Sequence, residues 1–314
     1  MDNLKTPTIL RLYLLFCLLC LFAIIMSNCK IVYGKNIYKI NNRTAEILKK
    51  IYTQRKKILR RRFAFLDGEK LTYKITYLGL IDAGKAILQT YPGSYNSKKV
   101  CVIKASAYSA KWLHFFYYVH DKTFSYFSLN KYYPYFMVMK RHEGSHNDFT
   151  EERLNVKYDK LIKSIKYKMA RKTLESKKYI KELKIKYNKP ALYKNRINAE
   201  WKPYIAYKYT QDALSALYYL RMLNLKNNKS YYIPVYENRK RYLALVKTDG
   251  YYNIDTPAGK FNTIKIKAYL NFNGVFTHKG SLKIYLSTGI NHTPVYLDTK
   301  IPIGYMTAIL IKKK

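Results

Sequence analysis

The chain has 314 residues, of which 48% are apolar, so it is long enough to bury a core and is not disordered as a whole. Its 59 lysines and arginines outnumber its 19 aspartates and glutamates, and the resulting net charge of +40 excludes an acidic, solvating protein. Tyrosine occurs 35 times but tryptophan only twice, a mixture that AT-rich coding alone can produce. Composition by itself therefore does not identify a function.

Residues 1–29 are predicted to be a signal peptide or a membrane anchor. Lys5 and Arg11 precede an uninterrupted apolar run from Leu12 to Met26, which is the order of a secretory signal. As a helix, the uncharged stretch would span roughly 27 Å, close to the ~30 Å hydrocarbon core of a bilayer. A cleaved signal and a retained anchor both fit, whereas lipidation of Cys29 is disfavoured because Asn28 precedes it.

Basic residues are concentrated in two segments. Residues 1–62 hold 14 basic and 2 acidic side chains, and residues 155–209 hold 17 and 4. Residues 30–64 are predicted to be a basic linker with a helix between Asn42 and Arg62, which would lie on an anionic membrane surface. No zinc-finger spacing, RNP-like strand or helix-turn-helix pattern is present, so we expect no sequence-specific binding of nucleic acid. Protein partners are not indicated by any motif.

Residues 65–314 are predicted to form a single, mainly β domain. Apolar and polar residues alternate strictly from Lys70 to Tyr77, which is typical of a half-buried strand. Many short strands favour an antiparallel curved sheet, an open barrel or a sandwich. The further expected strands are 86–91, 100–108, 113–119, 124–129, 135–140, 242–248, 251–255, 261–269, 282–287, 295–301 and 305–311.

Turns, one helix and one insertion interrupt this pattern. Turns are expected at residues 82–84, 91–94, 256–259 and 273–274 because of their glycine and proline content. A single amphipathic helix from Asp212 to Met222, with Asp212 as its N-cap, is expected to lie on the sheet. An insertion at about residues 160–205 is rich in lysine and is predicted to be partly helical.

Ordered sequence blocks within residues 66–311 resemble a bacterial family, domain of unknown function 3108 (DUF3108). The first block is GEKLTYKITYLG at residues 68–79, followed by AGKA at 83–86. Asp121 with Ser125, Glu143-Gly144 and DALSALYYLR at 212–221 follow in the same order. The last blocks are TPAGKF at 256–261, GVF at 274–276, GSLKIYL at 280–286 and PIG at 302–304.

The resemblance implies an exported protein in the periplasm or cell envelope of a Gram-negative bacterium. It also implies a mainly antiparallel β body without an established activity, and it supplies no catalytic residues. The chain departs from the family pattern after Leu286, where STGINH at residues 287–292 replaces the usual acidic residues. The lysine-rich insertion is also unusually long, so a family function that used those acids would be in doubt here.

The segment from His142 to His146 matches the zinc motif H-E-x-x-H. That motif needs both imidazoles on one face of a helix, but Gly144 and Ser145 are poor helix formers and a predicted strand precedes them. Glu151 and Glu152 follow too closely to supply a typical third ligand. We therefore expect a solvent-exposed hairpin turn, with zinc hydrolysis through His142 and His146 as a weaker alternative.

No catalytic, cofactor-binding or metal-binding residue is assigned, and no cofactor is expected. His114, His120, His278 and His292 have no nucleophile motif near them, and Asp121 and Asp212 are interpreted as structural. The favoured hypothesis is a non-catalytic envelope protein that binds a lipid or another amphipathic ligand in a sheet groove; the alternative is a structural or partner-binding envelope protein. The expected groove residues are Tyr73, Tyr77, Phe116, Tyr126 and Tyr285.

Overall fold

A computed structural model gives the fold of most of the chain. The predicted signal or anchor at residues 1–29, and with it the choice between cleavage and retention, lies outside the described residues. No helix within the described part is both long and apolar enough to cross a membrane. The described residues are 42–58, 63–115, 117–144, 146–155, 161–168, 202–205, 207, 209–237, 240–272, 275–301 and 304–314.

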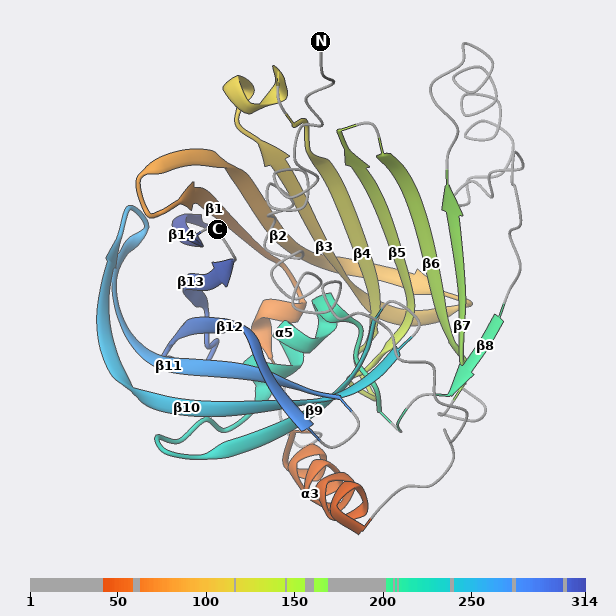
Figure 1. Cartoon of the computed structure of the whole chain (residues 1–314). Coiled ribbons are helices and arrows are strands. Elements are labelled where there is room, and N and C mark those ends of the chain that lie inside the picture. Colours follow the sequence, from red (N-terminus) through yellow and green to blue (C-terminus); the bar gives the residue numbers. More distant parts are fainter. Residues whose placement is uncertain are drawn as a thin grey trace.

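Two helices, two short 3₁₀ turns and fourteen strands make up the described residues (Figure 1). The helices are α3 (Asn42–Ile58) and α5 (Ala213–Met222), and the 3₁₀ turns are η1 (Ala64–Leu66) and η2 (Lys111–Phe115). The strands are β1 (Glu69–Tyr77), β2 (Ile81–Tyr95), β3 (Lys98–Ser109), β4 (His120–Ser128), β5 (Pro134–Glu143), β6 (His146–Asn155), β7 (Leu161–Lys168), β8 (Lys202–Ile205), β9 (Ser230–Glu237), β10 (Lys240–Thr256), β11 (Gly259–Phe272), β12 (Val275–Ser287), β13 (Pro294–Ile301) and β14 (Gly304–Lys313).

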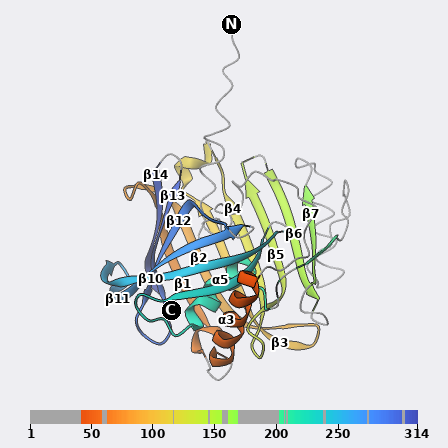
Figure 2. The ribbon, with the colours of Figure 1, turned by 60° about the horizontal axis from the view of Figure 1, so that its bottom comes forward.

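All fourteen strands belong to one antiparallel sheet, which confirms the predicted fold class and selects the curved sheet over the sandwich. The strand order is β8-β7-β6-β5-β4-β3-β2-β1-β14-β13-β12-β11-β10-β9. Strands that are consecutive in sequence are therefore paired, except for β8 and β9, which form the two edges, and β1 pairs with β14 in the middle of the sheet. The sheet curves so strongly that its two halves face each other across α5 (Figures 1 and 2).

Strand β2 runs straight through two segments that were expected to be turns. Residues 82–84 and 91–94 both lie within Ile81–Tyr95. The β1–β2 ladder ends at Thr90, so beyond that residue β2 is paired with β3 on one side only. Pro92, which has no amide hydrogen to donate, is tolerated there because no hydrogen bond to β1 is needed. Gly93 is required because a Cβ there would lie 2.5 Å from the side chain of Val102. The two expected turns are therefore a bulge and a close strand approach.

Other expectations also needed correction. The segment 113–119 is not a strand but includes part of η2, where the Leu113 amide bonds the Ala110 carbonyl. The expected strands at 242–248 and 251–255 form one strand, β10, with an irregularity between Thr248 and Tyr251. Within the insertion, which the sequence predicts to be partly helical, Leu161–Lys168 and Lys202–Ile205 are strands that pair as β7 and β8. Strand β9 was not anticipated.

Helix α5 begins where the sequence predicted, but it is more deeply buried than an amphipathic surface helix. Asp212 caps it, accepting a 2.7 Å hydrogen bond from the Ser215 amide, and the Ser215 hydroxyl accepts from the Asp212 amide in return. All ten residues of α5 are buried. The largest core cluster joins this helix to side chains from ten strands, β1 to β4 and β9 to β14. The helix therefore fills the concave side of the sheet.

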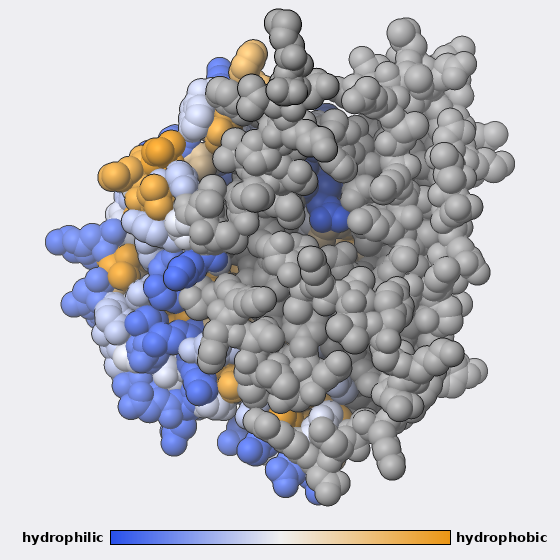
Figure 3. All heavy atoms as spheres, in the orientation of Figure 1, coloured by the Kyte–Doolittle hydropathy of each residue, from blue (hydrophilic) through white to orange (hydrophobic). Residues whose placement is uncertain are grey.

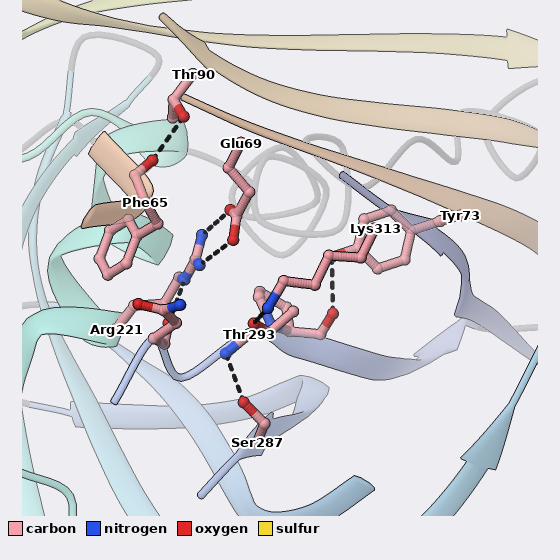
Figure 4. A network of polar contacts seen from close by, with 10 residues as sticks. Phe65, Glu69, Tyr73, Thr90, Arg221, Ser287, Thr293 and Lys313 are labelled. Atoms are coloured by element: carbon pink, nitrogen blue, oxygen red, sulfur yellow. Dashed lines mark hydrogen bonds and ion pairs between the residues drawn. The ribbon is translucent and has the colours of Figure 1, made fainter. Parts of the chain in front are cut away.

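A buried ion pair fixes the helix to the centre of the sheet (Figure 4). Arg221 donates from Nη1 and Nη2 to the two carboxylate oxygens of Glu69, over distances of 2.7 and 2.8 Å. Its Nε donates to the Asn291 carbonyl, and its guanidinium lies 4.0 Å from the ring centroid of Phe65. Bidentate pairing and stacking satisfy a charge that burial would otherwise make costly.

Helix α3 confirms the predicted basic helix and lies beside β9 (Figure 1). Ile47 and Ile51 pack against Leu243 of β10. Gln54 donates to the Tyr232 carbonyl and accepts from the Tyr232 amide, so one side chain bonds both backbone groups on the outer edge of β9. Farther along that edge, Gln211 bonds Pro234 and Tyr236 through its backbone. An edge that would attract another strand is therefore covered.

Candidate functional site

The segment that matches the zinc motif forms a β-hairpin, as predicted. His142 and Glu143 end β5, Gly144 turns the chain with φ 55°, and His146 opens β6 opposite Glu143. The helical spacing that the zinc motif requires is therefore not formed. Within the described residues, no group of three His, Cys, Asp or Glu side chains could hold a metal ion. The hairpin is not fully solvent-exposed, however, because the side chain of Glu143 is buried.

Glu143 instead forms a buried carboxyl pair with Asp121, the second residue of β4. Oδ1 of Asp121 accepts a 2.9 Å hydrogen bond from the His142 amide, which confirms the structural role expected for this aspartate. Its carboxyl group is also hydrogen-bonded to that of Glu143. Burial raises the pKa of Asp121, while its hydrogen bonds to Glu143 and to the His142 amide and the nearby charges of Arg141 and His120 oppose this shift.

Three histidines that are scattered in the sequence meet around Tyr118 next to this pair. The Tyr118 ring lies 4.8 Å from that of His114 and 5.0 Å from that of His142, and its hydroxyl is 3.3 Å from Nδ1 of His120. Burial, with help from the charges of Lys122 and His142, lowers the pKa of His120. This cluster could not be predicted from a local sequence pattern, because its histidines come from η2, β4 and β5.

The remaining named histidines do not join this cluster. Nδ1 of His292 lies 2.8 Å from the Arg221 carbonyl, near the buried ion pair. The side chain of His278 lies outside the described residues.

The five expected groove residues do not form one surface. Tyr73 is fully buried on the concave side and donates a 2.7 Å hydrogen bond to the Pro294 carbonyl, and Tyr77 packs beside the same core. Tyr126 packs in a separate cluster on the other face of the sheet, because neighbours along a strand face opposite ways. Tyr285 packs edge-on against Tyr252 and Tyr296, and Phe116 lies outside the described residues.

A cluster of exposed apolar side chains lies at the end of the sheet that carries the histidines (Figure 3). We call it the apolar rim. Leu80 is 86% exposed and Phe115 is 90% exposed. The rim comes from the β1–β2 turn, from η2 and from the start of β14, and consists of Leu78, Leu80, Ile81, Trp112, Phe115 and Tyr305.

Hydrogen bonds hold the parts of the apolar rim together. Nε1 of Trp112 donates to the Asp82 carbonyl at 2.9 Å, which ties η2 to the β1–β2 turn. The Tyr305 hydroxyl donates to the Leu78 carbonyl at 2.9 Å, and the Leu78 amide donates to the Tyr305 carbonyl. These bonds fix the polar atoms of the aromatic residues while their rings stay exposed.

The charged side chains around the apolar rim are mostly basic. Asp82 supplies an exposed carboxylate beside the rim. Four exposed lysines lie in the elements that carry the apolar rim or adjoin it, and Lys300 stands directly opposite Tyr305 in the β13–β14 ladder. These lysines are Lys74, Lys85, Lys111 and Lys300. The rim was not predicted from the sequence, although the large apolar residues beside Gly79 in a short turn are a visible sign of it.

Comparison with known proteins gives a family but no activity. The family model described as "Protein of unknown function (DUF3108)" matches residues 72–310. No curated protein matches the chain. A β-barrel-like DUF1849 protein from Brucella abortus aligns with 9% identity and a TM-score of 0.47, covering 79% of this chain and 97% of its own. A protein with a YmcC-like fold from Bacteroides fragilis aligns with 10% identity and a TM-score of 0.28, covering 79% and 96%.

Proposed function

The chain belongs to the DUF3108 family, whose function is unknown, and we propose that it is a non-catalytic protein of the bacterial cell envelope that binds anionic lipid surfaces through the apolar rim. The carrying observation is the exposure of six large apolar side chains at one end of the sheet. Exposed apolar side chains gathered at one end of a fold are typical of a site that meets a membrane or a protein. The apolar run near the N-terminus supports a location in the envelope.

The composition of the rim supports a lipid surface in particular. Tryptophan and tyrosine favour the boundary between water and hydrocarbon, where a ring is buried and a polar atom keeps its partner. Trp112 and Tyr305 already have such partners in Asp82 and Leu78. Each lysine near an anionic surface contributes about 1 kcal/mol of attraction at low salt. Four lysines therefore add to the apolar contribution.

The amphipathic partner expected from the sequence is thus assigned to the rim and not to a sheet groove. The reason is that α5 occupies the concave side, and its ten buried residues share one core with ten strands of the sheet. Exposed apolar atoms at the rim have no such cover among the described residues. Binding there requires no opening of the core.

Quenching of Trp112 by brominated lipid tests this proposal directly. The full chain carries two tryptophans, so Trp201→Phe leaves Trp112 as the sole reporter. We expect brominated vesicles of phosphatidylcholine and phosphatidylglycerol to quench Trp112, and vesicles of phosphatidylcholine alone to quench it less. This local signal reads the rim whether or not the N-terminal apolar run also binds the vesicle.

Matched variants distinguish lipid binding through the rim from nonspecific binding through any exposed apolar side chain. Leu80→Ser with Phe115→Ser should abolish the quenching, whereas Ile290→Ser should preserve it. Ile290 is 73% exposed, but it lies in the β12–β13 connection at the other end of the sheet. Absence of quenching in the otherwise unaltered chain would contradict the proposal. If Trp112 were instead buried by a co-purified protein, the rim would be a protein interface.

A further inference from the structure

Five lysines lie on the outer face of strands β1 to β4, the face turned away from α5 (Figure 1). They are Lys70, Lys74, Lys85, Lys104 and Lys122, and we call them the lysine face. The registers of three consecutive ladders place them on one side of the sheet, because side chains directly opposite each other, or two residues apart along a strand, share a side. Three of them are exposed and two are half-buried, so the face is open to solvent.

Like charges stand close together on the lysine face. Lys74 is directly opposite Lys85 in the β1–β2 ladder, a pairing that destabilises a sheet. Lys104 is opposite Phe124, which is two residues from Lys122 along β4, so these two lysines are diagonal neighbours. The lysines therefore do not serve to hold the strands together, and an anion between them would relieve their repulsion.

Within the described residues, no carboxylate forms an ion pair with the lysine face. Glu69 and Asp121 each precede one of its lysines in sequence, but both are buried on the other side of the sheet. Asp82 is exposed near the start of β2, where its Oδ1 accepts a hydrogen bond from the Gly84 amide. The positive charge of the face is therefore not neutralised by the described part of the chain.

Lysines on the outer face of the other half of the sheet do have carboxylate partners. Nζ of Lys265 and Nζ of Lys267 each lie 2.9 Å from Oδ2 of Asp249, and Nζ of Lys283 lies 2.8 Å from Oδ2 of Asp298. A high lysine content of the whole chain does not explain why carboxylates accompany these lysines and not those of the lysine face. The contrast indicates that the lysine face receives its counter-charge from a ligand.

Polar side chains lie between the lysines. Gln89 stands between two of them in adjacent ladders; it is half-buried, and its amide group has no hydrogen-bond partner among the described residues. In the next row, Thr72 and Ser106 flank Ile87 on either side. A ligand rich in hydroxyl groups therefore finds a hydrogen-bonding partner on this face, whereas an acyl chain finds little apolar surface.

The aromatic rings beside the lysine face are already engaged. Nζ of Lys104 lies 5.8 Å from the ring centroid of Phe124, and Phe124 and Tyr91 pack in one aromatic cluster. The Tyr108 ring lies 4.9 Å from that of His120. Bases of single-stranded nucleic acid gain affinity by stacking on rings that are free to receive them. With these rings engaged, the face favours a polyanion made of sugars over one that carries bases.

We propose that the lysine face binds an acidic polysaccharide, whose anionic groups pair with the lysines while its hydroxyls bond the Gln89 amide. Lys70 and Lys74 are four residues apart on β1, or roughly 13 Å, so one small anion cannot contact both, but a chain of charged sugars can. This proposal does not rest on lipid binding by the apolar rim. Lys74 and Lys85 lie near the rim, whereas Lys70 and Lys104 lie at the other end of the face.

Titrations of the full chain with two labelled polyanions, followed by fluorescence anisotropy, test this assignment. Polygalacturonate is a chain of carboxylated sugars, and a single-stranded oligodeoxythymidylate of equal charge represents nucleic acid. Lys70→Gln with Lys104→Gln, the lysine-face variant, should weaken polygalacturonate binding about tenfold. It should also lower the slope of log K against log salt by about one to two, because each lysine paired with a polyanion releases about one counterion.

A control variant of equal charge separates this site from binding to the overall positive charge. Lys226→Gln with Lys229→Gln removes two exposed lysines from the α5–β9 connection and should change polygalacturonate affinity much less. Equal losses in the two double variants would overturn the proposal. So would a larger loss for the oligodeoxythymidylate in the lysine-face variant, which would make the face a nucleic-acid site. Quenching of Trp112 by vesicles should persist in the lysine-face variant; its loss with unchanged polygalacturonate affinity would assign these lysines to the membrane.

Discussion

Arg221 and Glu69 stand 152 residues apart in sequence, yet their side chains form a two-point contact in the core, with N···O distances of 2.7 and 2.8 Å. Arg221 belongs to the buried helix α5, and Glu69 is the first residue of β1, which forms the β1–β14 junction. A fork of two parallel bonds fixes orientation as well as distance. The pair therefore sets how α5 is rotated against the centre of the sheet.

Removing one member of this pair should be strongly destabilising. We expect Glu69→Gln to lower the free energy of unfolding by about 3–5 kcal/mol, because Arg221 stays buried without a counter-charge. The double variant Glu69→Gln with Arg221→Met should lose less than Arg221→Met alone, because it leaves no unpaired buried charge. Urea unfolding of the four proteins measures both effects. Additive losses would show that the two side chains do not act as a pair.

The helix N-cap depends on a second buried contact. The Ser125 hydroxyl of β4 donates to Oδ2 of Asp212 at 2.6 Å, while burial raises the pKa of that carboxyl group. We expect Ser125→Ala to cost about 1–3 kcal/mol, since the carboxylate loses a donor that water cannot replace. Adding Asp212→Asn to this variant should change stability by a different amount than it does alone. Urea unfolding of this double-mutant cycle measures the coupling.

The Asp121–Glu143 pair predicts a pH dependence of stability. Because the pKa of Asp121 is raised in the folded state, its contribution is fully present below the unfolded value, near ~4, and is lost as pH rises through the folded value. We expect Asp121→Asn, which imitates the protonated form, to flatten this decline. Urea unfolding from pH 4 upward measures how the free energy of unfolding changes with pH. Asp255→Asn, which removes an exposed carboxylate, is the control. Identical slopes in both variants would contradict the assignment.

His120 predicts a trend of the opposite sign. Its pKa is lowered in the folded state, so it contributes stability above the unfolded value, near ~6.5, which is lost as pH falls through the folded value. We expect His120→Gln to remove this loss, because the glutamine cannot take up a proton. The same unfolding series, extended through pH 7.5, resolves the difference from the unaltered chain. A parallel pH profile would show that His120 is not perturbed by folding.

Gln54 predicts a local effect at the β9 edge. Gln54→Ala should free the Tyr232 amide and increase its hydrogen exchange, because the variant lacks the acceptor that covers this amide. Thr53→Ala is the matched control, since the Thr53 hydroxyl is exposed and donates to the Lys49 carbonyl within the same helix. Exchange at Tyr232 that is equal in both variants would mean that α3 does not protect the edge.

Local patterns in the sequence were sufficient for most strands and for one helix start. Strict alternation from Lys70 to Tyr77 gave β1, and the Asp212-Ala213-Leu214-Ser215 segment gave the cap of α5. These features depend on neighbours within one turn or one strand. Pro92 and Gly93 led to a wrong prediction of a turn. Whether a strand accepts these residues depends on where the β1–β2 ladder ends and on how closely β3 approaches.

The candidate sites were less predictable because they join distant segments. His114, His120 and His142 meet only after η2, β4 and β5 are packed side by side. The depth of α5 was also hidden, since the sequence shows an apolar stripe but not the curvature that wraps the sheet around every face of the helix. Family resemblance was confirmed over residues 72–310, yet it carries no activity.

The junction of β1 and β14 has a consequence for how this protein reaches its native state. Leu71 pairs with Lys313 and Tyr77 with Met306, so the central ladder is closed by segments more than 200 residues apart. Closing so long a loop costs entropy before any contact compensates for it, and chains with such distant pairings fold slowly. Neither half of the sheet has a complete centre until both strands are present. The core of the nascent chain therefore stays incomplete until synthesis reaches Gly304–Lys313. Formation of the sheet centre has to wait for this last strand.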